Sequence, residues 1–481
     1  MAAAQSKNRI YYINLAITVL ITFGVGFLPA FGNVTELGMK CLGVFLGSIY
    51  GWLTIGLIVP SLLSMLALSL VGFANIQQEF IDGFAYFLVP MMIITFTFVG
   101  VISMTGINQW ITEWLISRKI IIGRPYVLIA VLFIGAEILA IFQTSFVGVF
   151  MLWSIVVALG EEAGYEKHNK FVILMIPALM AVNIAANYLF PFFSGSIMYL
   201  SFYTQGTGAT IAPLSYILWE AIMINLYIVV FLLFLKFVVK LDLSGVAAAS
   251  EMYRDKQCPK MTKEQKLGFV LLLSFLIVML LPSLLPKTWM LTKTLAGLGI
   301  FGVLTIILLI MASLKNKDGS PLTSIQKAAE TIPWEVIWLL VASTPLAAAF
   351  NAEECGIMST LMGFLTPILT NMNAVVFVAI CTIGVGITTQ FVHNMIVAII
   401  LVPIWCPLFA AMGGNSATLF MCLAWALTFA YATPAASMNA ALIFGHASLE
   451  PKDGYINGFM HLALCLIVAI TVGIPLGNLI F

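Results

Sequence analysis

Residues 125–160, PYVLIAVLFIGAEILAIFQTSFVGVFMLWSIVVALG, decide how this chain folds. Only 36 residues separate Arg124 from Glu161, and Glu137 is the one charged side chain among them. Two complete membrane crossings with a turn need about 40 residues or more, because one crossing takes ~20 apolar residues. The polar centre at Gln143-Thr144-Ser145 therefore predicts the tip of a re-entrant helical hairpin, which is tolerated at membrane depth only where its backbone is buried in protein or lines water.

A second stretch, residues 373–411, repeats this pattern. It has an apolar limb after Asn373, a polar tip from Thr388-Thr389-Gln390 to His393-Asn394 and another limb to Phe409. The turns Thr105-Gly106-Ile107 and Cys355-Gly356-Ile357 precede the two tips at nearly the same distance. This similarity predicts two inverted repeats, an architecture that places a binding site at the membrane midplane.

The composition identifies a membrane protein. Of 481 residues, 62% are hydrophobic and 9% are charged, against about 25% charged in soluble globular chains. We expect an all-α polytopic membrane fold with about 11 transmembrane helices, and little chain is left for a soluble enzyme or nucleic-acid-binding domain. The net charge of +1 indicates no partner, and the seven cysteines are expected to be buried core residues rather than disulfides. The apolar spans, apart from the two hairpins, are 10–30, 37–54, 55–74, 86–107, 171–200, 214–236, 267–284, 291–313, 333–350, 416–445 and 455–480.

The positive charges set the expected orientation. With a cytoplasmic N-terminus, 18 of the 21 Lys and Arg residues lie on the cytoplasmic side or at its edge, which the positive-inside rule favours. We expect an integral protein of the bacterial plasma membrane whose C-terminus is outside. Because the first apolar run is long, a retained helix is favoured over a cleaved signal peptide. The expected segments are 1–36 (N-terminal helix), 37–236 (first repeat), 237–266 (cytoplasmic linker) and 267–481 (second repeat).

Each hairpin is followed by a helix that contains a proline and small polar residues. The span 171–200 is interrupted by FPFFSGS at 190–196, and the span 416–445 by TPAASMN at 433–439. Proline removes a backbone donor and frees a carbonyl, so half-helix ends offer amides to an anion and carbonyls to a cation. Residues 355–449 contain no charged side chain. We therefore expect an ion-coupled anion site built from neutral groups.

From about residue 38 onward the chain resembles the divalent anion/sodium symporter family, the dicarboxylate and citrate carriers of the ion transporter superfamily. The segment from Phe84 to Gly106 is similar to the family's helix before a Thr-Gly-Leu turn, and Ile332-Pro333-Trp334 to the start of the matching helix in the second repeat. The stretch from Asn439 to Gly445 is similar to the one after the family's Thr-Pro-Pro-Asn loop. The resemblance implies a transport domain of hairpins and broken helices, and a scaffold that forms a homodimer.

The family carries Ser-Asn-Thr at each hairpin tip, where the motif contacts sodium and a substrate carboxylate. The matching positions here read Thr144-Ser145-Phe146 and His393-Asn394-Met395, and the proline loop survives as Thr433-Pro434 and Asn439. The resemblance therefore implies sodium at Ser145 and Asn394. Since Phe146 and Met395 replace hydroxyl ligands with apolar surface, we hypothesise a substrate that is less charged or bulkier than succinate.

The candidate residues each have a structural alternative. Hydroxyls at a buried turn can satisfy backbone groups, His393 can be a neutral buried histidine, and proline can bend a helix for packing alone. Glu137 is either a coupling carboxyl or a protonated, hydrogen-bonded one, whereas Glu220, after Trp219, is expected to anchor at the membrane interface. The predicted substrate-binding residues are Thr144, Ser145, Ser194, Ser196, His393, Asn394, Thr433 and Asn439, and the predicted coupling-ion residues are Glu137, Ser145, Gly195 and Asn394.

The predicted function is secondary active transport of a small organic anion, a carboxylate, by ion-coupled symport or exchange with alternating access. Sodium or protons are both open as coupling ions. The alternative is a channel that uses the same hairpins as a filter. No catalytic or metal-binding motif appears in the sequence, so we expect no enzyme activity, no cofactor other than a sodium ion, no nucleic acid partner and contact with membrane lipid.

Overall fold

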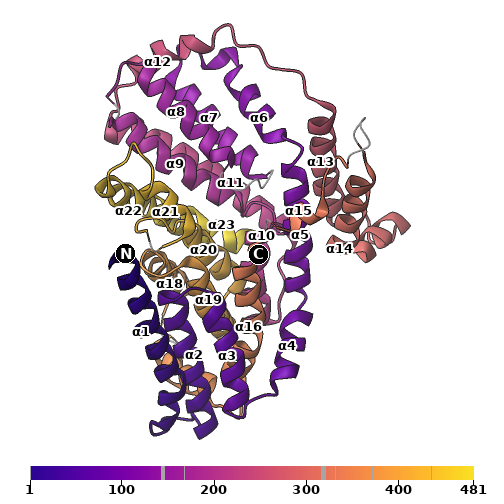
Figure 1. Ribbon diagram of the computed structural model, residues 1–481, viewed down its shortest axis with the longest axis vertical. Helices are drawn as coiled ribbons and strands as arrows, with labels where there is room; N and C mark the ends of the chain where they lie inside the picture. Colours follow the sequence, from indigo (N-terminus) through magenta and orange to yellow (C-terminus); the bar gives the residue numbers. More distant parts are fainter. Residues whose placement is uncertain are drawn as a thin grey trace. The chain divides into compact units, whose positions relative to one another are not determined.

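The computed structural model describes residues 2–141, 147–166, 168–315, 321–330, 332–369, 372–434 and 436–481. Throughout these ranges the regular secondary structure is helical (Figure 1). Eight helices are long and apolar enough to cross a membrane, or nine if the bent pair Ile76–Ala85 and Val89–Ser103 forms one span. The predicted all-α polytopic membrane fold is confirmed. The number of about 11 crossings and the inverted repeats stay predictions.

Contacts divide the chain into two compact units, each built from both halves of the sequence. Unit 1 comprises Met1–Ile93 and Ile332–Phe377, and unit 2 comprises Ile94–Thr331 and Val378–Phe481. Both predicted hairpins lie in unit 2, apart from the first residues of the second one. The segment boundaries expected from the sequence stay predictions, because compactness does not test a repeat.

Unit 1 is a helical bundle. In it α1 (Ala2–Gly24), α2 (Glu36–Thr54) and α3 (Ile58–Leu70) lie side by side (Figure 1). Gly47 allows α1 and α2 to approach closely, because a Cβ atom there would lie 2.1 Å from Thr22 Oγ1. The other elements of this unit are η1 (Val25–Phe27), α4 (Ile76–Ala85), the start of α5 (Leu88–Ser103), α16 (Trp334–Asn351) and α17 (Ile357–Leu369).

The two similar turns found in the sequence have the same backbone conformation. Gly106 and Gly356 have φ values of 70° and 66°, a left-handed conformation that glycine adopts without steric cost. Each turn leads into a helix that begins at the next isoleucine, α6 (Ile107–Ile116) in unit 2 and α17 in unit 1.

The first hairpin of unit 2 consists of α7 (Pro125–Ile141) and α8 (Val147–Glu162), which pack on each other and on α9 (Lys170–Ala186) (Figure 1). With 17 and 16 residues, each limb is ~25 Å long, less than the ~30 Å hydrocarbon core. These short limbs agree with the geometry that the sequence predicts. The tip residues between them lie outside the described residues.

The predicted second hairpin falls on α18 (Ala374–Thr388) and α19 (Asn394–Ala411). Because α19 is one of the eight helices long enough to cross a membrane, the re-entrant geometry of this segment stays a prediction. The two spans expected to be interrupted are each two helices, α9 and α10 (Ser194–Thr207) in one case, and α20 (Ser416–Thr428) and α21 (Met438–Phe444) in the other. Every residue of α20 from Thr418 to Thr428 is buried, so this helix lies in the core of unit 2. Helix α10 packs along α19.

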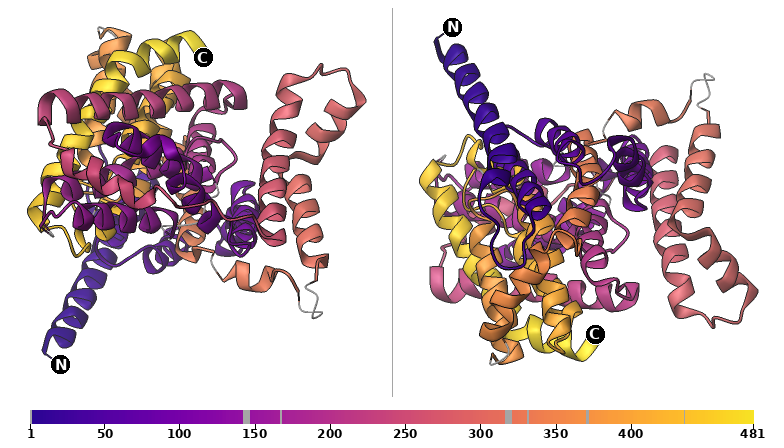
Figure 2. Two further views of the ribbon diagram at one scale, coloured as in Figure 1. Left: turned by 90° about the horizontal axis from the view of Figure 1, so that it is seen from above. Right: turned by 90° about the horizontal axis from the view of Figure 1, so that it is seen from below.

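The remaining helices of unit 2 are the following. They include α11 (Pro213–Leu233), which continues into η3 (Phe234–Val239), and the antiparallel pair α13 (Lys263–Leu284) and α14 (Met290–Ser313), which stand next to each other in Figure 2. The expected linker contains two short helices, α12 (Ser244–Ala249) and η4 (Ser250–Tyr253), before the capping box of Thr262 and Gln265 starts α13. The other elements are η2 (Lys119–Ile121), α15 (Ile325–Ala329), α22 (Pro451–Val468), η5 (Ala469–Gly473) and α23 (Ile474–Ile480).

Candidate functional site: a buried polar network at the second hairpin tip

Asn394 is the first residue of α19 and is 6% exposed. Its Oδ1 atom accepts a hydrogen bond of 2.9 Å from the Met395 amide, and Nδ1 of His393 accepts from the same amide at 3.3 Å. These contacts cap the amino end of α19, where the first amides have no partner within the helix. The backbone N–H of Asn394 donates a hydrogen bond of 3.1 Å to the backbone carbonyl of Ala436. The hairpin tip is therefore bonded to the break of the second interrupted helix.

Gln390 makes a second connection between this tip and the same break. Its side chain is fully buried, and the hydroxyl of Thr433 donates to its backbone carbonyl. A buried side-chain amide without hydrogen-bond partners destabilises the fold. The side-chain bonds of Gln390 therefore hold the hairpin tip against the chain that follows α20. The Gln390 side chain donates to Gly386 O (2.8 Å) and Phe429 O (3.0 Å) and accepts from Tyr431 N (3.2 Å) and Ala432 N (2.8 Å).

The break of the first interrupted helix reaches the same site through two tyrosines. The Asn394 Nδ2 atom donates to the Tyr199 hydroxyl at 3.1 Å. The rings of Tyr199 and Tyr188 stack with centroids 4.9 Å apart. Gly195 makes room for this pair, because a Cβ atom at this position would lie 3.0 Å from the Tyr188 ring. Ser196 donates to the Tyr188 carbonyl at 3.1 Å.

We call Asn394, Gln390, Tyr199, Tyr188 and Ser196 the tip network. It brings together predicted residues from the second hairpin and from both breaks, including Thr433 and Gly195. Asn394 already uses its amide group on protein partners, because Nδ2 also lies 3.5 Å from the Leu427 carbonyl. A ligand at Asn394 would therefore have to replace one of these partners.

Four of the predicted site residues lie elsewhere or are only partly described. Thr144 and Ser145 lie outside the described residues, and Ser194 is placed as the first residue of α10 without its side chain. The residue before it, Phe193, makes no side-chain capping bond. Asn439 is half-buried on α21 and makes no side-chain hydrogen bond with another described residue.

Glu137 lies apart from the tip network. Its carboxyl, half-buried on α7, is bonded to the side chain of Asn225 on α11. The neighbouring carbonyl of Ala136 accepts a bond of 3.0 Å from Asn183. These contacts join α7 to α11 and α9, and the predicted coupling role of Glu137 stays a prediction.

Tyr188, Tyr199 and Gln390 belong to the tip network but were not among the site residues predicted from the sequence. Tyr188 and Tyr199 flank the first break, and nothing in their spacing pointed to Asn394, which is almost 200 residues away. The expectation that Glu220 anchors at the membrane interface is wrong, because its side chain is 1% exposed within the protein.

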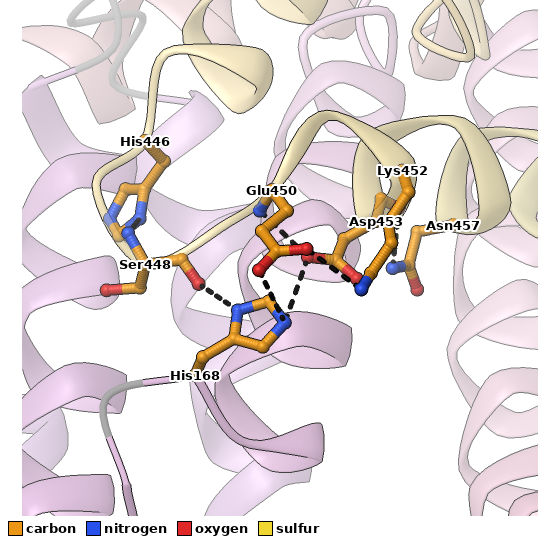
Figure 3. Close-up of polar contacts among 7 residues, drawn as sticks. All are labelled: His168, His446, Ser448, Glu450, Lys452, Asp453 and Asn457. Atoms are coloured by element: carbon orange, nitrogen blue, oxygen red, sulfur yellow. Dashed lines mark hydrogen bonds and ion pairs between the residues drawn. The ribbon is translucent and has the colours of Figure 1, made fainter.

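A second polar cluster, made of His168, Glu450, Lys452 and Asp453, joins the loops before α9 and α22 (Figure 3). His168 Nδ1 lies 3.3 Å from the carbonyl of Ser448, and Nε2 lies 3.5 Å from Asp453 Oδ2 and 4.0 Å from Glu450 Oε1. Lys452 Nζ lies 2.8 Å from Glu450 Oε2. We call this group the loop cluster.

The charges of the loop cluster stabilise one another. The hydrogen bond from Lys452 and then its positive charge lower the pKa of Glu450. The ligand atoms of His168, Glu450 and Asp453 lie within 4.8 Å of one another, close enough to hold a metal ion. Lys452 already provides a positive charge beside the carboxylates of Glu450 and Asp453, as a metal ion would.

A cavity of about 660 Å³ opens in unit 2 between α8 and the chain that follows α21. Trp153 of α8 and His446 form one wall, with their rings edge to face and centroids 5.1 Å apart. The walls are mostly apolar, and Ser448 links the cavity to the loop cluster.

Known proteins resemble this chain in sequence and in fold. The sodium-dependent dicarboxylate transporter SdcS of Staphylococcus saprophyticus is 25% identical over 235 residues, 48% of this chain and 44% of that protein. The human Na(+)/dicarboxylate cotransporter 3 is 28% identical over 145 residues, 30% of this chain and 24% of that protein. The chain thus matches less than half the length of each of these curated relatives. No family model matches the chain.

The crystal structure of the YdaH transporter of Alcanivorax borkumensis has a similar fold. The match has a TM-score of 0.59 at 12% identity, and it covers 84% of this chain and 87% of that one. At this identity the match is evidence of fold alone. The chain is thus similar in sequence to sodium-dependent dicarboxylate transporters and similar in fold to the YdaH transporter.

Proposed function

We propose that this protein is a secondary active transporter that moves a small organic anion, a carboxylate, together with or in exchange for an ion. The main support for this proposal is that buried hydrogen bonds of Asn394 and Gln390 join the second hairpin tip to the chain around the second break. These residues lie in the stretch 355–449, which has no charged side chain. Oriented amides and hydroxyls in a dry environment bind an anion without a buried Lys or Arg. The curated relatives are named as sodium-dependent dicarboxylate transporters, which supports the substrate class.

In this proposal the substrate carboxylates contact the tip network. Asn394 exchanges a protein partner for the anion or for a sodium ion, since a side-chain amide both donates and accepts hydrogen bonds. The α10 end at Ser194, Gly195 and Ser196 provides backbone donors, because its capping position makes no side-chain bond. The remaining proposed contributors are Thr144, Ser145, His393, Thr433 and Asn439 for substrate, with Ser145 for sodium and Glu137 as a further coupling group.

We propose that transport proceeds by alternating access, in which unit 2 carries the site and moves as a body. Unit 1 is the proposed scaffold of a homodimer. This division assigns binding and movement to the unit that holds both hairpins and both breaks. The proposed transport needs no catalytic residues, and sodium is its one proposed cofactor.

Counterflow tests the carrier against the channel. Purified protein is reconstituted into liposomes preloaded with unlabelled succinate, and uptake of trace radiolabelled succinate is measured in sodium and in choline buffer. A carrier gives a transient accumulation above equilibrium, and sodium coupling makes it depend on sodium. A channel gives equilibration without an overshoot, which would contradict the proposal. Competition by larger carboxylates in the same assay tests the hypothesis of a bulkier substrate, which fails if succinate and citrate compete as strongly as any larger anion.

A further inference from the structure

Glu220 on α11 is a buried carboxyl that the proposed anion site does not use. Its side chain is 1% exposed, and its Oε2 atom has no hydrogen-bond partner among the described residues. The neighbouring Trp219 is fully buried and donates to Gly473 O at 3.1 Å, so this part of α11 is enclosed by protein rather than lipid. An unpaired carboxylate in such a place costs several kcal/mol. This cost favours the neutral carboxylic acid over the carboxylate in this conformation.

The groups that face Glu220 are all neutral at physiological pH. Tyr188, Tyr216 and Cys422 interact electrostatically with its carboxyl, and no cationic partner is found for it among the described residues. The other titratable side chains on the elements packed against α11 are Tyr126 and Glu137 of α7, Lys170 of α9, Lys236 of η3, Lys263, Glu264 and Lys266 of α13, and Lys452, Asp453, Tyr455, His461 and Cys465 of α22, whereas η5 and α23 have none.

Polar contacts connect this carboxyl to the proposed anion site. Tyr188, which interacts electrostatically with the Glu220 carboxyl, stacks on the Tyr199 ring, and the Tyr199 hydroxyl accepts a hydrogen bond of 3.1 Å from Asn394. A parallel contact runs from Tyr216, one helical turn before Glu220, to the Ser196 hydroxyl. All of these groups belong to unit 2. A charge that forms at Glu220 would thus act on the same polar groups that are proposed to receive the substrate.

We propose that Glu220 is a proton-binding site coupled to the anion site through Tyr188, Tyr199 and Asn394. The inference rests on the proposed function. The carboxylate takes one proton from water to become the acid and returns it to water when the site opens, with no other bond formed or broken. Because protonation removes a negative charge close to a site for anions, the two ligands favour each other, and linkage makes this reciprocal. Anion binding then draws a proton onto Glu220, and anion affinity falls as pH rises.

A purely structural carboxylic acid makes a different prediction. Such a group would keep its proton with or without the anion, and its replacement by the isosteric amide would leave the pH dependence of binding unchanged. The slope of affinity with pH is therefore the decisive quantity. Glu79 in unit 1 provides a matched control, because it is 2% exposed and both of its carboxyl oxygens lack partners among the described residues.

The experiment measures the Kd of radiolabelled succinate for the purified full-length protein across a pH range in which succinate stays a dianion. We expect the wild-type Kd to rise about tenfold per pH unit at the steepest, the limit for uptake of one proton. The Glu220→Gln variant should show a flat profile, and Glu79→Gln the wild-type slope. Tyr199→Phe keeps the carboxyl but breaks the connection, so it should flatten the slope and guard against a Glu220→Gln variant that fails to fold.

A pH-sensitive dye in weak buffer reports the proton directly. About one proton per bound succinate should leave the solution with wild-type protein, and none with Glu220→Gln. A flat wild-type profile, or a sloped profile retained in Glu220→Gln, would overturn the proton site while counterflow still supports transport. Absence of counterflow with wild-type protein, both for succinate and for every larger carboxylate tested, would instead remove the proposed function itself.

Discussion

The two polar clusters of unit 2 differ in burial and in charge. The tip network is buried and consists of amides, hydroxyls and backbone groups, with Asn394 6% exposed and Gln390 fully buried. The loop cluster contains formal charges, and the side chains of His168, Glu450 and Lys452 are 38%, 53% and 67% exposed. Water compensates the charges of Glu450 and Lys452 in the loop cluster, whereas nothing would compensate a charge in the tip network.

This difference teaches how an anion site can be built where charge is expensive. The chain keeps its ion pairs in loops and offers only dipoles at the proposed binding depth, so a bound anion would not compete with a resident carboxylate or be held by a lysine. A transporter must release its substrate, and binding by neutral donors suits that requirement. The following predictions sharpen or break the comparison.

The largest expected effect is on the stability of the tip network. Replacing Gln390 by Leu removes four side-chain hydrogen bonds and leaves buried backbone groups of the break without partners. With ~1 kcal/mol for each bond, the loss is about 4 kcal/mol. Thermal unfolding followed by tryptophan fluorescence should show a large decrease in Tm. Gln109→Leu is the control, because this glutamine is exposed on α6, and an equal Tm for both variants would contradict the account.

The next effect concerns binding at Asn394. The Asn394→Ala variant loses a donor and an acceptor at the proposed site, and we expect succinate counterflow to fall about 100-fold, a loss of ~2.7 kcal/mol. The matched control is Asn351→Ala, since that amide is exposed on α16 and donates to its own helix. Counterflow at the wild-type rate from a folded Asn394→Ala protein would remove this residue from the site.

A smaller effect is expected at Tyr199. Tyr199→Phe keeps the stacked ring but takes away the hydroxyl that accepts from Asn394. The loss of one hydrogen bond, ~1 kcal/mol, should weaken succinate binding about fivefold. Tyr203→Phe serves as the comparison on the same helix, because its hydroxyl contacts Ser416 at 3.1 Å rather than Asn394. Equal affinities for both variants and the wild type would show that the tyrosine is not connected to the site.

The smallest effect is expected in the loop cluster. Because Lys452 lowers the pKa of Glu450 in the folded protein, their contact stabilises the fold above the unfolded pKa of about 4.3, and this contribution is lost as pH falls through the lower folded value. Lys452→Ala should therefore lower Tm slightly at about pH 7 and leave it unchanged at about pH 3. A difference that grows on acidification would have the wrong sign. Transport should be unaffected.

The sequence predicted those features that depend on local pattern. The shortage of apolar residues in 125–160, the prolines at 191 and 434 and the absence of charge in 355–449 are properties of single stretches. The structure has the packed short helices α7 and α8 in the first of these stretches, and it divides both spans that contain the prolines into two helices.

The partners of the site residues could not be predicted, because they depend on packing between distant parts of the chain. Tyr199 and Asn394 meet only because α10 packs along α19, and the four bonds of Gln390 depend on how the chain turns after α20. Glu220 was assigned to the interface because a tryptophan beside a carboxyl is typical there. Its burial follows from the surrounding helices, which the local sequence does not contain.

A cryo-EM structure of the full-length protein with saturating succinate tests the central claim most directly. The account predicts density for the anion in contact with the Asn394 side chain and the 433–439 segment, with no Lys or Arg side chain near it. Density for succinate against Lys452 and His168 of the loop cluster, with none at Asn394, would contradict it.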